Sequence, residues 1–127
     1  YGPSGCGQHA KLANQIMQAG IMSGVCEALS YVKEKGLDPE VFMEGAAAGA
    51  GQNALLQAYG PRIVKGDLDP GFFIDFFIKD LKLAYDSATE SGLALDSLAN
   101  TVSHYEKLSE EGLGRLGMQA LMKYYEK

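Results

Sequence analysis

Polar side chains gather at the start of the first helix that the sequence predicts. They recur at spacings of three and four residues, so they share one helix face. The members of this patch are Lys11, Asn14, Gln15 and Gln18. A lysine that is partly buried and positioned by amides can donate or accept a proton, because burial disfavours its charged form. The alternative is a solvated first turn with a surface lysine, and spacing alone leaves both interpretations open.

A second stretch that could do chemistry combines aromatic and charged residues. It reads Phe72-Phe73-Ile74-Asp75-Phe76-Phe77-Ile78-Lys79-Asp80-Leu81. Asp75 and Lys79 are four residues apart with the acid first, which is the favourable order for an ion pair on a helix. The functional alternative is a lysine held among aromatic side chains, where it can reach a bound ligand.

Neither a phosphate loop nor a metal site is predicted near Lys11. Gly5 and Gly7 precede this lysine, but no glycine comes directly before it, no Ser or Thr follows it, and no strand leads into it. Cys6 and His9 supply too few ligands for a metal ion, and no carboxylate is near them in sequence. We therefore expect no metal.

Hydrophobic periodicity predicts an all-α fold, a bundle of about six helices built around one long buried helix. The expected helices cover residues 8–35, 52–65, 72–91, 96–110 and 116–125, and Gly36 should end the first of them. Another helix should start at Asp38-Pro39, an N-cap followed by proline, and fade over residues 45–51. Gly60-Pro61 should interrupt the third helix, and residues 66–71 read as a loop. His104 falls in the fifth helix and is predicted to lie on its surface.

The first helix stands out because it carries so little charge. Glu27 is its only formal charge between Lys11 and Lys33, so we expect protein to surround it on most sides. Gly20 and Gly24 predict the close approach of another helix, since glycine is otherwise costly in a helix interior. Glu27 is expected to cap or hydrogen-bond another helix, with a catalytic carboxylate as the alternative.

Length and composition limit the classes of protein. A chain of 127 residues with 46% hydrophobic residues predicts one domain. A formal charge of −5 argues against a dedicated nucleic-acid binder. No secretory leader is recognised, and the stretch 12–32 is too polar for a membrane span, so we expect a cytoplasmic protein. Because a Gly/Pro/Ser loop over residues 1–7 leads straight into a buried-type helix, we expect a piece of a longer protein.

Two separated motifs resemble the C-terminal domain of the β-hydroxyacid dehydrogenases. They are Gly5-x-Gly7-x-x-x-Lys11-Leu12-Ala13-Asn14-Gln15, and Phe72 followed by Ile78-Lys79-Asp80-Leu81. That family includes 3-hydroxyisobutyrate dehydrogenase and tartronate semialdehyde reductase (2-hydroxy-3-oxopropionate reductase). The resemblance covers essentially the whole chain. It implies an all-α domain, like the C-terminal domain of 6-phosphogluconate dehydrogenase, that follows an N-terminal Rossmann domain and faces it across the active site.

The resemblance also implies a role for each motif residue. Lys11 falls on the catalytic lysine, and Asn14 and Gln15 fall on amides that orient the lysine and the substrate. Many members have Asn at the position of Gln15, which bears on the choice of substrate. Lys79 falls on a lysine that approaches bound NAD or NADP, and Phe72 and Asp80 line the same region.

These implications lead to one expected function and one alternative. The chain is expected to act on a small hydroxy acid or its semialdehyde, together with the Rossmann domain of the same parent chain. It is expected to be inactive alone, because it lacks the strand and Gly-rich turn that seat the cofactor's pyrophosphate. Homo-oligomers are expected, without nucleic-acid or membrane partners. The alternative is a non-catalytic helical interaction module that kept the scaffold for oligomerisation.

Overall fold

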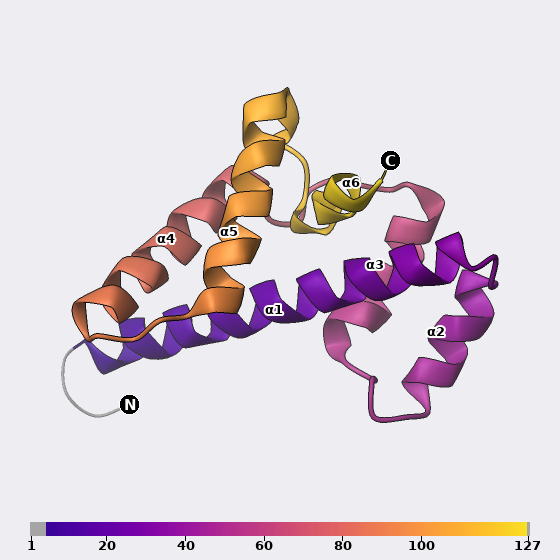
Figure 1. Ribbon diagram of the computed structural model, residues 1–127, viewed down its shortest axis with the longest axis horizontal. Helices are drawn as coiled ribbons and strands as arrows, with labels where there is room; N and C mark the ends of the chain where they lie inside the picture. Colours follow the sequence, from indigo (N-terminus) through magenta and orange to yellow (C-terminus); the bar gives the residue numbers. More distant parts are fainter. Residues whose placement is uncertain (1–4, 127) are drawn as a thin grey trace.

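One long helix runs through the molecule, and shorter helices pack on either side of it (Figure 1). The computed structural model describes residues 5–126, and the expected loop over residues 1–4 lies outside them. Within the described residues there is no strand, only an isolated bridge between Phe73 and Gly117. The helices are α1 (Cys6–Glu34), α2 (Pro39–Ala47), α3 (Ala54–Lys65), α4 (Ile74–Glu90), α5 (Asp96–Leu108) and α6 (Met122–Tyr125). The all-α prediction is confirmed.

The long helix α1 is buried along one side only, so the expectation that protein surrounds it on most sides is wrong for this chain. Its buried stripe consists of Leu12, Ala19, Met22, Val25, Cys26, Leu29 and Val32. On the opposite stripe, Met17 keeps 60% of its surface exposed and Tyr31 keeps 63%. A Cβ added at Gly20 or Gly24 would meet nothing within 4 Å. Within residues 5–126 no helix makes the close approach predicted at these glycines, because the shorter helices do not cover this side of α1.

Two helices begin at side-chain caps, and the cap at Asp38 confirms the predicted one. The Asp38 carboxylate accepts a hydrogen bond from the Glu40 backbone N–H at 2.9 Å, with Pro39 at the first helical position. The Asn53 side chain accepts from the Leu56 N–H at 2.8 Å and starts α3. These caps satisfy backbone N–H groups that have no partner within their own helix.

The predicted interruption of the third helix at Gly60-Pro61 is wrong, because α3 continues from Ala54 to Lys65. Pro61 lies on the exposed side, where water can satisfy the carbonyl that loses its partner. Gly60 is buried against α2, and a Cβ there would come within 2.7 Å of the Met43 sulfur. Close packing explains this glycine.

The prediction of one last helix over residues 116–125 is also wrong. A 3-10 turn covers Met118–Leu121, and α6 that follows is a single turn. The Gly117 N–H donates to the Leu68 carbonyl at 2.9 Å, and the Met118 N–H donates to the Phe72 carbonyl at 3.1 Å. Gly117 has an extended backbone, with φ −72° and ψ 163°, so an α-helix that begins at residue 116 would be broken there.

The core is organised around Tyr105 on α5, which is completely buried. Its ring meets Phe77 of α4 edge to face, with centroids 5.3 Å apart. Its hydroxyl donates to the Met118 carbonyl at 2.8 Å. Gln119, also fully buried, donates to the carbonyls of Asp67 and Asp69. These bonds hold the C-terminal segment and the loop before α4 against the helices.

Candidate active site

The lysine patch lies in the first turns of α1, at the end where α4 packs against it. Gly5 precedes the helix in the left-handed conformation, with φ 96°, which favours glycine. Lys11 and Asn14 are exposed, whereas Gln15 and Gln18 are half-buried. The partial burial that the proton-transfer hypothesis needs is therefore absent for Lys11 among the described residues.

Helix α4 brings the second motif to this patch. The Gln15 side-chain amide donates to the Asp80 carboxylate, with 3.0 Å between Nε2 and Oδ2. These two residues are 65 positions apart in sequence, and each belongs to a different predicted set of site residues. The bond therefore places Asp80 beside the amide patch of Lys11, with Lys79 as its neighbour on α4.

Phe72 contributes to the packing that fixes the start of α4. Its ring is half-buried and meets the fully buried Phe77 edge to face, with centroids 5.8 Å apart. Its carbonyl accepts from the Met118 N–H. Phe72 therefore anchors the segment that leads to Lys79 and Asp80.

The predicted ion pair between Asp75 and Lys79 is wrong. Asp75 instead accepts a hydrogen bond from the Ser109 hydroxyl at 2.6 Å, and its own N–H donates to the Gly114 carbonyl. A Cβ at Gly114 would overlap the Asp75 carboxylate, so the glycine leaves room for this contact. Within residues 5–126 Lys79 has no ion-pair partner, and its exposed ammonium is available to a ligand.

Glu27, His104, Tyr124 and Tyr125 form a polar cluster where α1, α5 and α6 meet, and the sequence did not predict that they come together. Glu27 is exposed and accepts a hydrogen bond from the Tyr125 hydroxyl at 3.1 Å, which confirms its predicted bond to another helix. His104 is half-buried and stacks on Tyr124, with ring centroids 3.9 Å apart. Burial lowers the pKa of His104, a larger effect than the opposing one of Glu27. The expectation of a surface histidine is therefore wrong.

No helix in residues 5–126 is long and apolar enough to cross a membrane. The same residues contain no group of three or more His, Cys, Asp or Glu side chains that could hold a metal ion.

Comparison with known proteins identifies the family. Residues 5–125 match the family model described as NAD-binding of NADP-dependent 3-hydroxyisobutyrate dehydrogenase. The chain belongs to this family. It is 45% identical over 121 residues to the probable 3-hydroxyisobutyrate dehydrogenase-like 1, mitochondrial, of Arabidopsis thaliana. It is 33% identical over 125 residues to 2-hydroxy-3-oxopropionate reductase of Escherichia coli.

Solved structures of two family members share the fold. The 3-hydroxyisobutyrate dehydrogenase of Salmonella typhimurium matches with a TM-score of 0.83 and 24% identity, over 90% of this chain and 40% of that one. The Mycobacterium tuberculosis enzyme, solved with L-serine, matches with a TM-score of 0.85 and 20% identity, over 93% of this chain and 43% of that one.

The chain is much shorter than its relatives. The matches cover 95% of it but only 36% of the Arabidopsis protein, and 98% of it but only 43% of the Escherichia coli reductase. Both relatives therefore contain a large part that has no counterpart in this sequence.

Proposed function

We propose that this chain is the helical, lysine-bearing domain of an NAD(P)-dependent oxidoreductase that interconverts a small 2- or 3-hydroxy acid and its semialdehyde. The observation that carries the proposal is the hydrogen bond between Gln15 and Asp80, in a chain of this family. It joins the two motif segments and puts the Lys11 patch and Lys79 at the same end of the molecule.

Lys11 is the proposed general acid–base group. In reduction its ammonium donates a proton to the aldehyde oxygen, and in oxidation its neutral amine accepts the hydroxyl proton. Gln15 is held by Asp80 through one amide N–H, which leaves its second N–H and its carbonyl oxygen for the lysine or the substrate. Asn14, one residue before it, offers a second, exposed amide. These amides orient the reacting groups.

The nicotinamide of NAD or NADP supplies or receives the hydride when bound. The residues here fit the edge of such a cofactor, because Lys79 offers an exposed ammonium and Asp80 keeps one carboxylate oxygen outside its bond to Gln15. They do not seat the pyrophosphate, since residues 5–126 contain no strand that leads through a Gly-rich turn into a helix. Lys79, Asp80 and Phe72 are thus proposed to line the cofactor from one side.

A Rossmann domain of the same parent chain is the proposed second half of the site. The exposure of Lys11 supports this, because a proton-transferring lysine needs cover that the described residues do not give it. The short coverage of the relatives supports it as well. The chain alone is therefore proposed to be inactive.

The test compares the 127-residue chain with the same chain joined to the Rossmann domain of its parent. Both are assayed for NADH and NADPH oxidation with tartronate semialdehyde and with methylmalonate semialdehyde. We expect turnover from the joined protein only. Ordinary dehydrogenase rates from the short chain, or none from the joined protein with any small semialdehyde, would contradict the proposal.

The exposed side of α1 favours a second candidate, an oligomerisation module. Met17, Ile21 and Tyr31 lie on this side, and apolar side chains exposed together are typical of protein contacts. We propose that the protein forms homo-oligomers through this side of α1. We also propose that the protein is cytoplasmic. Sedimentation should show that Ile21→Glu shifts the assembly toward monomers. Oligomers that keep the Lys11 patch but show no turnover when joined to the Rossmann domain would favour the non-catalytic module.

A further inference from the structure

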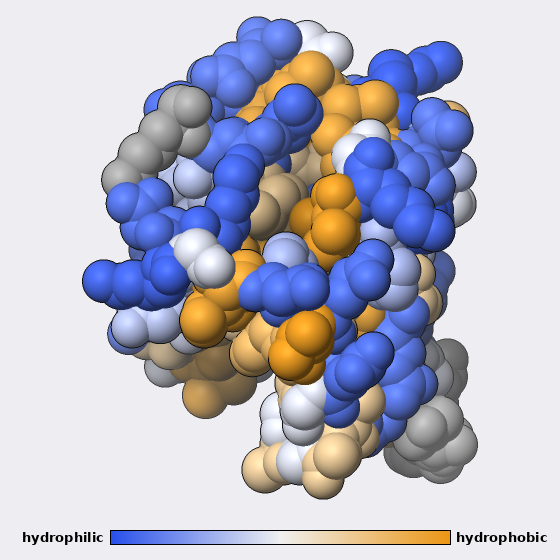
Figure 2. Space-filling view, turned by 90° about the vertical axis from the view of Figure 1, so that its right-hand side faces the viewer, coloured by the Kyte–Doolittle hydropathy of each residue, from blue (hydrophilic) through white to orange (hydrophobic). Residues whose placement is uncertain are grey.

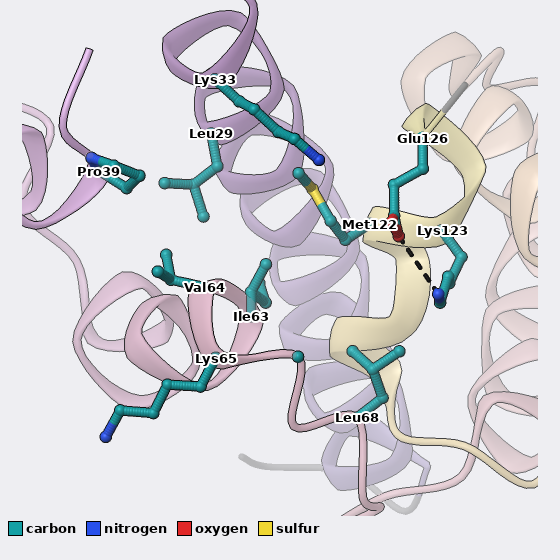
Figure 3. A pocket seen from close by; sticks show the side chains of 11 residues that line it. Leu29, Lys33, Pro39, Ile63, Val64, Lys65, Leu68, Met122, Lys123 and Glu126 are labelled. Atoms are coloured by element: carbon teal, nitrogen blue, oxygen red, sulfur yellow. Dashed lines mark ion pairs between the residues drawn. The ribbon is translucent and has the colours of Figure 1, made fainter. Parts of the chain in front are cut away.

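A cleft lies at the far end of α1 from the Lys11 patch, between α1, α3 and α6 (Figure 3). Along α1, Leu29 lies about 27 Å from Lys11 at a rise of about 1.5 Å per residue. The cleft encloses about 460 Å³, which is within the range of small-molecule sites. It is thus separate from the proposed active site and large enough for a small organic ligand.

The walls of the cleft are largely apolar. Leu29 and Ile63 are buried core residues that form part of its lining, and Leu68 and Met122 are half-buried there. Val64 stands at the rim with 39% of its surface exposed. The space-filling view of this end of the molecule shows hydrophobic patches set among hydrophilic side chains (Figure 2). An apolar part of a ligand would be removed from water on these walls.

Charge at the cleft is positive, although the whole chain carries a formal charge of −5. Three lysines and one acidic residue line it. Lys123 pairs with Glu126 at 3.4 Å, and Lys65 extends away from the cleft. Lys33 reaches across toward Met122, and among residues 5–126 it has no ion-pair partner (Figure 3). One unneutralised ammonium therefore stands over an apolar floor.

The position of Lys33 in the last turn of α1 has a simpler explanation, a favourable interaction with the helix dipole. That explanation accounts for a cation at the helix end. It does not account for the apolar lining of the cleft that the Lys33 side chain overlies.

We propose that this cleft binds a small amphiphilic carboxylate, with the carboxylate on Lys33 and the hydrocarbon body against Leu29, Ile63 and Met122. A single positive charge above an apolar surface complements a single negative charge on an apolar body. The site is independent of the proposed oxidoreductase activity, and its ligand is not expected to react.

Sodium octanoate is the probe, and octanol is its neutral counterpart. Titration of the 127-residue chain, followed by amide NMR shifts, should show octanoate shifting Val64 and Leu68 and binding more tightly than octanol. We expect Lys33→Gln to weaken octanoate binding about tenfold, the loss of one partly exposed charged contact. Lys35→Gln is the matched control, since Lys35 is two residues away, lies over the Tyr31 ring and does not line the cleft.

A second variant makes the test independent of Lys33. Val64→Glu puts a carboxylate at the rim and should abolish octanoate binding, and circular dichroism checks that each variant is folded. Equal affinity for octanoate and octanol, or unchanged octanoate affinity in Lys33→Gln, overturns the proposal. Shifts at Val64 and Leu68 that follow protein dilution but not octanoate would assign the cleft to contacts between copies of the chain, and would overturn it too.

Discussion

The hydrogen bond between Gln15 and Asp80 joins the two motif segments, and its contribution to stability can be measured. Replacing Gln15 with Ala removes the donor, and replacing Asp80 with Ala removes the acceptor. Each single change also alters local packing and helix propensity. A double-mutant cycle cancels these side effects and leaves the coupling between the two side chains.

The expected coupling follows from the geometry. The separation of 3.0 Å is ideal for an amide donating to a carboxylate, and both side chains are half-buried. Hydrogen bonds to charged groups contribute roughly 1.5–3 kcal/mol, and partial exposure to solvent reduces this value. We therefore expect a coupling of about 1 kcal/mol in the free energy of unfolding.

The assay is urea denaturation of the wild type, the two single variants and the double variant. The matched control is a cycle on Lys82 and Glu106, which also joins two helices at 3.0 Å but has side chains 56% and 41% exposed. That pair should couple less strongly, because solvent weakens ion pairs between exposed side chains. A Gln15–Asp80 coupling no larger than this control would refute the assignment of Asp80 as the residue that holds Gln15.

Three further predictions concern single groups. Tyr105→Phe should lower the free energy of unfolding by about 1–2 kcal/mol in urea denaturation, because the buried Met118 carbonyl loses its donor; an unchanged midpoint would contradict this. Burial raises the pKa of Cys26 to about 12, so at pH 8 a thiol reagent should label Cys6 alone in the folded chain and both cysteines in urea. Fast labelling of both cysteines in the folded chain would contradict the burial of Cys26. Burial lowers the pKa of His104, so the unfolded state takes up a proton at higher pH than the folded state, and the free energy of unfolding should fall as pH drops below about 6.5. His104→Gln should remove that part of the pH dependence, and an unchanged dependence of stability on pH in this variant would contradict the prediction.

Much of the fold could be predicted from local signals. Periodicity and the Gly36 stop located α1 to within two residues at each end, and Gly36 has φ 73° as a helix-terminating glycine should. The cap at Asp38-Pro39 located the start of α2. These predictions succeeded because each depends on neighbouring residues alone.

The errors in the fold came from tertiary contacts. Whether Pro61 breaks α3 depends on which side of the helix faces water, and Gly60 leaves room for the Met43 side chain of another helix. Residues 116–121 have the apolar pattern of a helix, but the backbone is extended at Gly117, where hydrogen bonds to Leu68 and Phe72 tie the segment to neighbouring loops. A local pattern contains neither kind of information.

For the candidate site, too, local spacing predicted some features and tertiary contacts determined the others. Spacing put Lys11 and Gln15 on one face of α1, and the structure agrees. The contact with Asp80 spans two helices, so only the family resemblance grouped these residues in advance. The predicted pairing of Asp75 with Lys79 was wrong because the Ser109 hydroxyl, 34 residues away in sequence, donates to the Asp75 carboxylate instead.

The most direct test of the proposed function is the turnover number of Lys11→Met in the protein joined to its Rossmann domain. Methionine keeps the apolar stem but cannot transfer a proton, and Lys35→Met is the matched control, at the residue that caps the far end of the same helix. We predict that Lys11→Met lowers kcat by about a hundredfold or more while cofactor affinity and the free energy of unfolding stay unchanged. A kcat near that of the wild type would contradict the assignment of Lys11 as the proton-transferring group.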